Sequence, residues 1–400
     1  MKRLSNHIKR TLLLTALSCA SVCIMPNVFY DVMPVCAASE VSASDEERII
    51  QELQQQAEAG NAEAQYKLGN RYYYGKYTEE NHGKAVYWYL QAAKQGDVAA
   101  QITLAECYSW RGILPRDKEL EIYWYTQAAE QGDVSAQFHL AEYYDRLDIS
   151  PQNDKMIIYW YTKAAEQNNF KAQYQLADYY HYSKYHLNNK QSLKKAVYWY
   201  QKAAEQGYSL AQYDLGHCYE KGIGVEQDYV KAVYWYTKSA EQVYYYACES
   251  LARCYSLGIG VEKDEAKSAY WDKLTAEKGF FLAQYRMAMR YCFGKGVKQD
   301  YKKAVYWLTK SADCGYWPAQ RDLGLCYYNG HGVDKDEAKA VEWYTKSAEQ
   351  GDKDAQYALA LCYQNGTGIA KDDTQAKYWL TKSAEQGHEI AKEALAKMNE

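Results

Sequence analysis

The sequence lacks the short motifs that most often mark catalytic or metal sites. Its eight histidines form no H-E-x-x-H zinc motif, and its eleven cysteines form no C-x-x-C pair. Its glycine-rich loops are not followed by the G-K-[ST] that completes a phosphate-binding loop. The acidic residues show no pattern that would place two carboxylates across a cleft. We therefore expect no metal, no cofactor and no catalytic residue, and we predict that the protein is not an enzyme.

The sequence also lacks a membrane-spanning segment and a clustered basic face, which excludes two classes of partner. After residue 38, no segment is apolar enough to cross a membrane. The formal net charge is −4, and without residues 1–38 the chain keeps 43 basic and 50 acidic residues, a charge of −7. A nucleic-acid-binding protein would show a clustered basic face, which this sequence does not have. The sequence therefore predicts neither nucleic-acid binding nor membrane insertion of the processed chain.

The first 38 residues have the pattern of an export signal. Four basic residues within the first ten precede the apolar segment Thr11–Met25, which is too short to span a bilayer. Ala37 and Ala38 offer a cleavage site. We predict that residues 1–38 are a signal peptide and that the protein is exported, to the periplasm, the cell surface or the medium. An uncleaved interfacial anchor is the alternative, because the long segment Pro26–Val35 separates the apolar region from the cleavage site.

From about residue 45, the chain repeats one unit. An Ala-Gln pair opens it at positions 64, 100, 136, 172, 211, 283, 319 and 355, with variant openings at 247 and 391. The step is 36 residues except for one interval of 39, and nine of the eleven tryptophans keep the same step. Each unit holds two apolar stripes of period 3.6, which five copies separate by G-x-G-[VI]-x-x-D. The stripes predict a helical hairpin, and the period predicts a solenoid.

The repeats resemble a known family. Their pattern is A-x-x-W-Y-x-K-[AS]-A-E-Q-G followed by A-Q-x-x-L-[AG]-x-x-Y-x-x-G-x-G-V-x-x-D, which is similar to the Sel-one-like repeat, a 36-residue relative of the tetratricopeptide repeat. Residues 196–224 and 340–368 match nearly throughout, and the resemblance covers about residues 45–398. It implies a right-handed α/α superhelix that serves as a scaffold for protein–protein interaction. In bacteria such proteins are often exported for signalling, envelope assembly or host contact, and the family shares no catalytic residues.

We predict an all-α fold, a right-handed α/α superhelical solenoid of nine 36-residue hairpins with a half-repeat at each end. Residues 39–63 would hold a linker and a capping helix, opened by the capping box Ser44-Asp-Glu-Glu47. Residues 64–390 would form the nine repeats, and residues 391–400 the C-terminal capping helix. The G-x-G loops are interpreted as turns, with Asp228 capping a second helix. Each tryptophan or leucine sheltered by the next copy contributes about 1.5–3 kcal/mol.

One exported, cysteine-rich branch of that family joins the helices of each repeat by a disulfide, and some members bind or hydrolyse β-lactams. This chain departs from that pattern. After residue 38 its cysteines are Cys107, Cys218, Cys248, Cys254, Cys292, Cys314, Cys326 and Cys362, and only the seventh repeat has one in each helix. Five share one repeat position, so they lie about 10 Å apart, beyond the reach of a disulfide. We interpret the cysteines as free, half-buried thiols, and a disulfide ladder is the alternative.

A single motif points toward β-lactam chemistry. Ser192-Leu-Lys-Lys195 matches the S-x-x-K of penicillin-recognising enzymes, but neither S-D-N nor K-T-G accompanies it. Ser192 stands where the second helix of the fourth repeat is expected to begin, so we interpret it as an N-cap. A β-lactam-binding or β-lactam-hydrolysing protein is therefore an alternative function, which a nitrocefin assay would test.

The first helix of each repeat is predicted to expose one face. Positions 1, 4, 5 and 8 after the opening alanine should face the core, and positions 2, 6, 9 and 10 should line a concave surface, by analogy with tetratricopeptide arrays. In repeats 1–4 these positions are aromatic and acidic: Tyr66, Asn70, Tyr73, Tyr74, Glu106, Trp110, Phe138, Glu142, Asp145, Arg146, Tyr174, Asp178, His181 and Tyr182. In repeats 6–9 they are more apolar: Arg253, Leu257, Tyr285, Met289, Phe293, Leu325, Tyr328 and Leu361.

This distribution predicts a groove with two parts, an acidic and aromatic part for a basic or carbohydrate ligand and an apolar part for a partner helix. Solvated variation without a ligand is the alternative. We predict an exported, non-catalytic scaffold that binds protein partners through its concave face, in an envelope, signalling or host-contact role. A carbohydrate-binding envelope factor is another alternative, favoured by the tyrosines and the tryptophan on that surface, with a peptide or a glycan as ligand.

Overall fold

The computed structural model describes residues 43–75, 80–109, 113–147, 150–183 and 189–399. Within these ranges all twenty elements of regular structure are α-helices, and neighbouring helices pair into hairpins of an α/α solenoid. The predicted fold class is thereby confirmed. The predicted signal peptide lies outside the described residues. The described residues form two compact units, one that ends at Leu104 and one that begins at Ala105.

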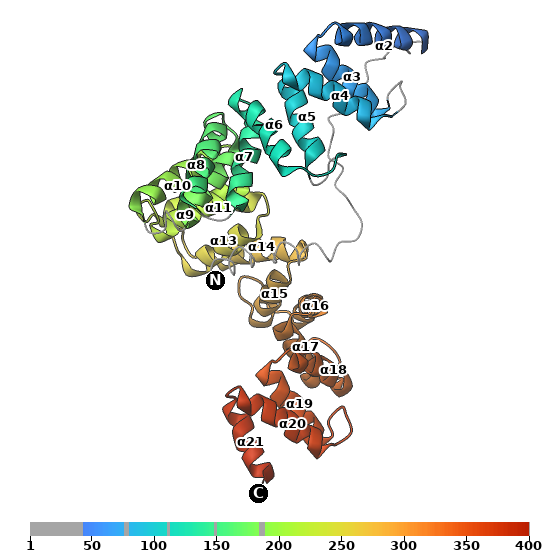
Figure 1. Cartoon of the computed structure of the whole chain (residues 1–400). Coiled ribbons are helices and arrows are strands. Elements are labelled where there is room, and N and C mark those ends of the chain that lie inside the picture. The colour runs from blue at the N-terminus through green and yellow to red at the C-terminus, as the bar shows by residue number, and fades with distance from the viewer. Residues whose placement is uncertain (1–42, 76–79, 110–112, 148–149, 184–188, 400) are drawn as a thin grey trace. The chain divides into compact units, whose positions relative to one another are not determined.

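The first unit contains α2 (Ala43–Glu58), α3 (Ala62–Tyr74), α4 (His82–Lys94) and the start of α5 (Val98–Tyr108) (Figure 1). Helix α3 packs against α2 and α4, and Leu68 and Ala57 are buried in its core. Helix α3 begins after Asn61, whose side chain accepts a hydrogen bond of 2.8 Å from the Ala64 amide. The predicted capping box is wrong in position, because α2 already includes Ser44 at its second residue.

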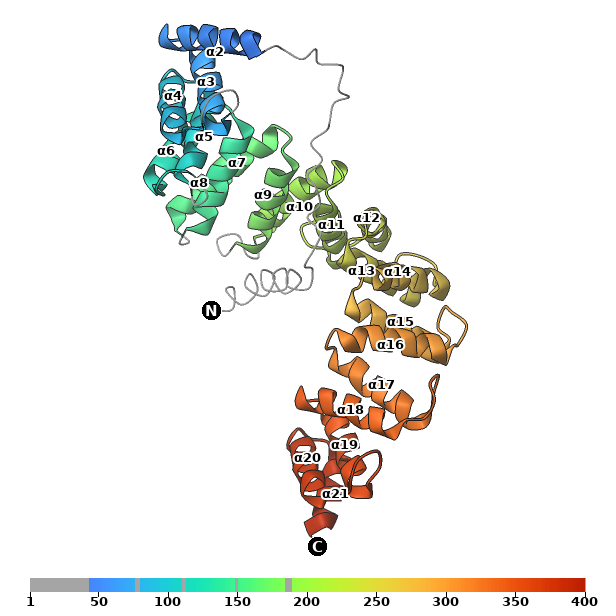
Figure 2. The ribbon, with the colours of Figure 1, turned by 90° about the vertical axis from the view of Figure 1, so that its right-hand side faces the viewer.

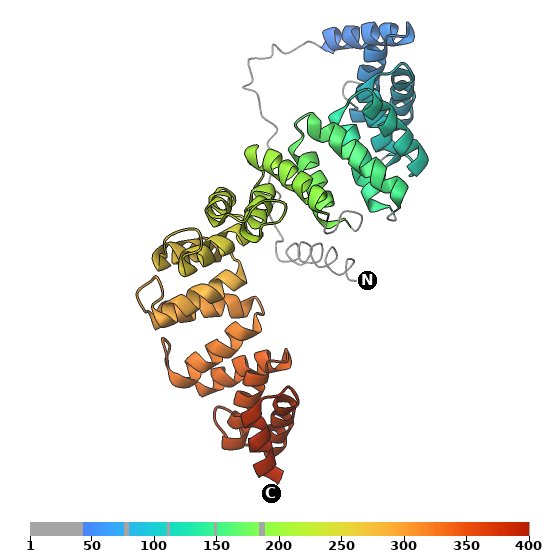
Figure 3. The same cartoon turned by 90° about the vertical axis from the view of Figure 1, so that its left-hand side faces the viewer.

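In the second unit each helix packs against the next helix of the chain, and Figures 2 and 3 show the pairs from α13 to α20 lying one on another. The helices are α6 (Lys118–Glu130), α7 (Val134–Arg146), α8 (Pro151–Glu166), α9 (Phe170–Tyr182), α10 (Lys190–Glu205), α11 (Ser209–Lys221), α12 (Tyr229–Glu241), α13 (Tyr245–Leu257), α14 (Glu265–Glu277), α15 (Phe281–Phe293), α16 (Tyr301–Asp313), α17 (Trp317–Asn329), α18 (Glu337–Glu349), α19 (Lys353–Asn365), α20 (Asp373–Glu385) and α21 (Glu389–Asn399).

The G-x-G loops are turns, as predicted. Gly222 ends α11 with a φ of 68°, and Asp228 caps α12 by accepting a hydrogen bond of 2.9 Å from the Lys231 amide. The second glycine of the motif has another role. A Cβ on Gly224 would collide with the carbonyl oxygen of Leu193 in the preceding repeat. The motif therefore both turns the chain and brings two repeats close together.

The tryptophans are less buried than the sequence predicted. The tryptophan column lies at the margin of the core, because five of its nine members are only half-buried. The residue that follows each tryptophan is instead buried, as Tyr236 and Leu308 illustrate. Tyr236 fits closely against Gly216, where a Cβ would meet its ring at 2.8 Å. The small residue of the first helix therefore makes room for this ring.

A glutamine clamp joins successive repeats, and the sequence analysis did not find it. Gln212 is buried, and its Nε2 donates a hydrogen bond of 3.1 Å to the Ala204 carbonyl of the preceding helix. Its Oε1 accepts a hydrogen bond of 2.8 Å from Gln242 of the same repeat. Five other joints have the same glutamine pair. The clamp satisfies both buried ends of an amide side chain, which an apolar contact alone would not do.

Candidate functional site

The candidate site is the exposed face of the first helices, called here the first-helix surface and defined by positions 2, 6, 9 and 10 of each repeat. In the first unit it lies on α3, where Tyr66, Asn70 and Tyr73 are half-buried and Tyr74 is 73% exposed. Asn70 accepts a hydrogen bond of 2.8 Å from the Tyr89 hydroxyl, and Tyr73 packs edge-on against Tyr74. The first unit therefore presents an aromatic edge. Trp110, another predicted site residue, lies outside the described residues.

The acidic part of the surface lies in the second unit. Glu106 and Asp145 are exposed, and Glu142 and Asp178 are half-buried. A hydrogen bond from His139, supported by the charge of Arg146, lowers the pKa of Glu142, so this carboxyl stays ionised at neutral pH. The half-buried ring of Phe138 packs against Tyr161 at 5.9 Å. The predicted acidic and aromatic character is present on α7, with Arg146 as its exposed basic residue.

Two predicted contact residues of α9 do not line the surface. Tyr174 is buried because Tyr208 covers it, with ring centres 5.2 Å apart, and its hydroxyl donates a hydrogen bond of 3.0 Å to Asp214. His181 is buried because Tyr200 and Tyr182 pack on it. Tyr182 itself is 41% exposed. The position rule placed these residues correctly on the helix but could not foresee the aromatic rings that cover two of them.

On α11 the surface position 9 holds a buried carboxylate that is paired with a basic residue of α13. Glu220 of α11 is buried and accepts hydrogen bonds of 2.8 Å from Tyr236 and 2.6 Å from Arg253 of the next repeat. Burial raises the pKa of Glu220, but the hydrogen bonds from Lys221 and Tyr236 and the charge of Arg253 outweigh it, and the pKa is lowered. Arg253 is thereby held on the surface by a carboxylate beneath it.

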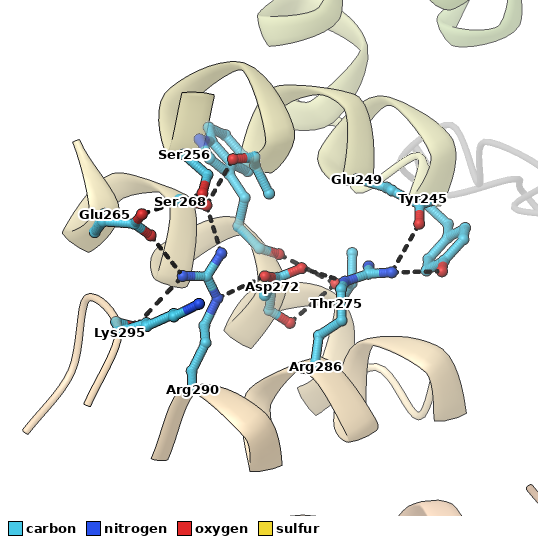
Figure 4. A network of polar contacts seen from close by, with 12 residues as sticks. Tyr245, Glu249, Ser256, Glu265, Ser268, Asp272, Thr275, Arg286, Arg290 and Lys295 are labelled. Atoms are coloured by element: carbon cyan, nitrogen blue, oxygen red, sulfur yellow. Dashed lines mark hydrogen bonds and ion pairs between the residues drawn. The ribbon is translucent and has the colours of Figure 1, made fainter. Parts of the chain in front are cut away.

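A denser polar network joins α13, α14 and α15 (Figure 4). At its centre is Asp272, 1% exposed, at the position where every other repeat has tyrosine or leucine. Its two carboxylate oxygens accept hydrogen bonds of 2.7 Å from the Nε atoms of Arg286 and Arg290. Arg290 also pairs with Glu265 at 3.2 Å. The buried carboxylate is therefore neutralised on both sides.

The outer end of the network reaches the surface. Arg286 pairs through Nη1 with Glu249 at 2.7 Å and donates to the Tyr245 hydroxyl at 3.3 Å (Figure 4). Burial lowers the pKa of Arg286, but the charge of Asp272 outweighs it, so the pKa is raised and the guanidinium stays charged. This network was not predicted from the sequence. Its signal was that Ser268 and Asp272 depart from their repeat columns at the joint where Arg290 takes the place of the more frequent cysteine.

An apolar ridge follows on α13, α15 and α17. It consists of Leu257, Met289, Phe293, Leu325 and Tyr328, of which Leu257 is 64%, Phe293 68% and Leu325 49% exposed. Single exposed apolar residues are common, but neighbouring ones on successive helices mark interaction surfaces. Leu361 continues the position on α19 and is half-buried. Tyr285 is half-buried, and its hydroxyl donates a hydrogen bond of 2.9 Å to Asp322. Of the apolar residues predicted for repeats 6–9, four are exposed and three are half-buried: Leu257, Phe293, Leu325 and Tyr328 are exposed, and Tyr285, Met289 and Leu361 are half-buried.

The sequence also raised metal ligands, cysteines and Ser192 as candidates. Among the described residues, no group of three or more His, Cys, Asp or Glu could hold a metal ion, and no helix is both long and apolar enough to span a bilayer. The eight described cysteines are free, but they are not half-buried as interpreted, because six are buried, Cys314 is exposed and only Cys292 is intermediate. The N-cap interpretation of Ser192 is wrong, because α10 begins at Lys190 and Asn189 caps it by accepting from the Ser192 amide at 3.2 Å. Ser192 is buried within the helix, and the Lys195 ammonium lies over the Tyr180 ring.

Comparison with known proteins agrees with the repeat pattern. The Sel1 repeat family model matches residues 62–97, 98–133, 134–169, 170–208, 209–244, 246–280, 282–316, 317–352 and 353–388. Comparison with the curated proteins finds no match. Proteins with Sel1 repeats generally mediate protein–protein interaction.

Two solved structures are similar over most of the chain. One is a protective antigen of uropathogenic Escherichia coli strains that displays an SLR fold; it is 31% identical, with 87% of this chain and 82% of that chain covered and a TM-score of 0.61. The other is a Sel1 repeat protein from Oxalobacter formigenes; it is 33% identical, with 78% and 90% covered and a TM-score of 0.66. The chain belongs to the Sel1 repeat family.

Proposed function

We propose that this protein is an exported, non-catalytic scaffold that binds a protein partner through the first-helix surface of its second unit. The observation that carries the proposal is the apolar ridge. Leu257, Phe293 and Leu325 are each about half or more exposed on successive first helices of a folded unit. Covering such side chains contributes about 25 cal/mol for each Å² removed from water, so a partner that buries them gains affinity.

The acidic part of the surface would fix the direction in which a partner binds. Ionised carboxylates on α7 and α9 favour a basic segment, whereas the ridge favours the apolar face of a helix. A partner with a basic segment and an apolar helix would therefore bind in one direction only. The pattern of residues 1–38 supports export, which fractionation of cells and N-terminal sequencing of the mature protein would test.

Site-specific photo-crosslinking in the native cell tests the ridge. A benzoylphenylalanine at Phe293 should give a discrete partner adduct, whereas one at Tyr306, 54% exposed on the second helix α16, should not. Leu257→Lys combined with Leu325→Lys should abolish the adduct at position 293. The matched pair Tyr234→Lys and Tyr378→Lys, on second helices, should leave it unchanged. Equal adducts from positions 293 and 306, or an adduct that survives the ridge variant, would refute the proposal.

A further inference from the structure

A second surface of the second unit follows the edge where the first helices begin. Helices α3, α7, α9 and α19 begin after Asn or Asp residues whose side chains accept hydrogen bonds from the helix amides. Helices α11, α13, α15 and α17 begin instead after Tyr208, Tyr244, Phe280 and Tyr316, which make no such bond. Losing a polar cap costs about 1 kcal/mol for each helix. Four successive repeats carry this cost.

The four aromatic residues pack against rings of the preceding repeat. Tyr208 contacts Phe170 with ring centres 5.1 Å apart, Phe280 stacks on Tyr245 at 4.7 Å, and Tyr316 contacts Phe281 at 5.4 Å. Such pairs contribute about 0.5–1.5 kcal/mol each, which offsets the lost cap. They also hold the outer rings in fixed orientations. The edge is therefore lined by packed aromatic rings, and its outer rings Phe170, Tyr246, Phe281 and Trp317 are here called the aromatic strip.

The strip keeps part of its aromatic area open. Phe170, Tyr246, Phe281 and Trp317 are 37%, 43%, 40% and 41% exposed, although each is supported by neighbouring groups. These rings lie in repeats 4, 6, 7 and 8, at the start of α9, α13, α15 and α17. The strip is aromatic, whereas three of the five residues of the apolar ridge are aliphatic. It presents flat rings at intervals of one or two repeats.

Planar polar groups accompany the rings, and their charges are balanced. Arg286 lies over the Tyr245 ring and pairs with Glu249 (Figure 4), and Arg321 lies 6.0 Å from the Trp317 ring and pairs with Asp354 at 3.2 Å. The carboxylates of Glu249 and Asp354 are about half exposed, 43% and 50%. A strongly charged partner finds no complementary field here, because each guanidinium already has its carboxylate. Hydroxyl groups, however, can donate to these carboxylates.

We propose that the aromatic strip binds an extended, uncharged glycan. A sugar ring has an apolar C–H face that stacks on an aromatic ring, and its hydroxyls donate to carboxylates and accept from guanidinium groups. A polymer of repeated sugar units can place successive rings over platforms that recur along the repeats. A proline-rich peptide also stacks on aromatic rings, but its prolines have no N–H to donate to Glu249 and Asp354. A glycan can both stack on the exposed rings and donate hydrogen bonds to the carboxylates of Glu249 and Asp354.

The test is a printed array of neutral and acidic glycans probed with the full chain, followed by titration of the best neutral oligosaccharide. Phe281→Ala combined with Trp317→Ala should weaken binding about tenfold or more, the effect of losing about 1.4 kcal/mol. The control pair is Tyr234→Ala and Tyr270→Ala, exposed tyrosines of second helices, which should bind like the wild type. A six-sugar chain should bind more tightly than a three-sugar chain, because it reaches more than one platform.

If the double variant does not fold by circular dichroism, Phe170→Ala with Tyr246→Ala tests the strip at other joints. Binding to no neutral glycan, or binding unchanged by the strip variants, would overturn the proposal. A proline-rich decapeptide that binds while neutral glycans do not would overturn it as well. Because the crosslinking test concerns the apolar ridge on another set of residues, either proposal can fail without the other.

Discussion

Repeat 7 has an incomplete glutamine clamp, and completing it should stabilise the protein. Gln284 is buried and donates a hydrogen bond of 3.3 Å to the Ala276 carbonyl, but its Oε1 has no partner within the described residues. Its partner position holds Cys314, where seven other repeats have glutamine, as in the joints where this glutamine donates to the matching oxygen. We therefore expect Cys314→Gln to raise the free energy of unfolding.

The magnitude follows from the geometry of the other joints. Cys314 ends α16 with φ −76° and ψ 3°, and Gln350 ends α18 with φ −81° and ψ 0°, so a glutamine at 314 starts from the same backbone conformation. Gln350 reaches Gln320 at 2.7 Å. Satisfying a buried acceptor by one neutral hydrogen bond contributes about 1 kcal/mol, and at most about 3 kcal/mol if the orphan oxygen is fully desolvated.

Urea unfolding followed by circular dichroism measures the change. Because repeat arrays can unfold in stages, hydrogen exchange of the amides in α16 and α17 should show the same gain locally. Cys314→Ser is the control, since it removes the thiol without reaching Gln284, and Gln350→Ala should lose about 1 kcal/mol by opening an intact clamp. Equal midpoints for the glutamine and serine variants would show that the orphan oxygen is already satisfied by water.

Three more substitutions or treatments test other parts of the structure. Asp272→Ala should destabilise the protein by about 3 kcal/mol, because the partly buried guanidinium groups of Arg286 and Arg290 lose the carboxylate they share and keep only Glu249 and Glu265. Asp272→Tyr combined with Arg286→Ser and Arg290→Cys should unfold near the wild-type midpoint; equal losses would contradict this. Gly260→Ala should lower the urea midpoint more than Gly279→Ala, because both have positive φ but only a Cβ at 260 meets the Tyr229 backbone. Iodoacetamide at pH 8 should modify exposed Cys314 first among the described cysteines, because burial raises the pKa of Cys107 to about 11 and that of Cys248 to about 12; equal labelling by mass spectrometry would contradict this.

Sequence periodicity was sufficient for the hairpins, because burial of one helix face repeats with the same spacing in every copy. Asp228 and Gly222 could be assigned from their chemistry alone, since caps and left-handed turns depend on local residues. The burial of Tyr174 and His181 could not, because rings from other helices cover them. The sequence also did not predict that, in most repeats, the residue after the tryptophan is more buried than the tryptophan itself. This order depends on how closely the small residue of the first helix allows a ring to approach.

The polar network at Asp272 was visible in the sequence only as a set of departures from the repeat. One departure is uninformative, since surface positions vary freely. Ser268 stands in a column that is mostly alanine, Asp272 in a column of tyrosine and leucine, and Arg290 in a column that is mostly cysteine, although repeat 1 also has Arg71 there. A column-by-column comparison that asks which departures meet at one joint would have identified the network. Such a comparison would also have found Cys314 opposite Gln284.

Some positions of the repeat build the core and others are free to vary, which explains how one fold can present different surfaces. Alanine, leucine and tyrosine columns bury the helix faces, and the glutamine clamp satisfies the polar groups between repeats, so stability is a sum over joints. Positions outside these columns can change without loss of the core. The second unit uses this freedom in an acidic region, an apolar ridge and an aromatic strip. Within the described residues, the Asp272 joint places a buried ion where the other repeats have tyrosine or leucine, an exchange that apolar residues would match in stability. Arg286 of this joint holds Glu249 and Tyr245 beside the strip, so we infer that the joint serves the geometry of the surface rather than stability.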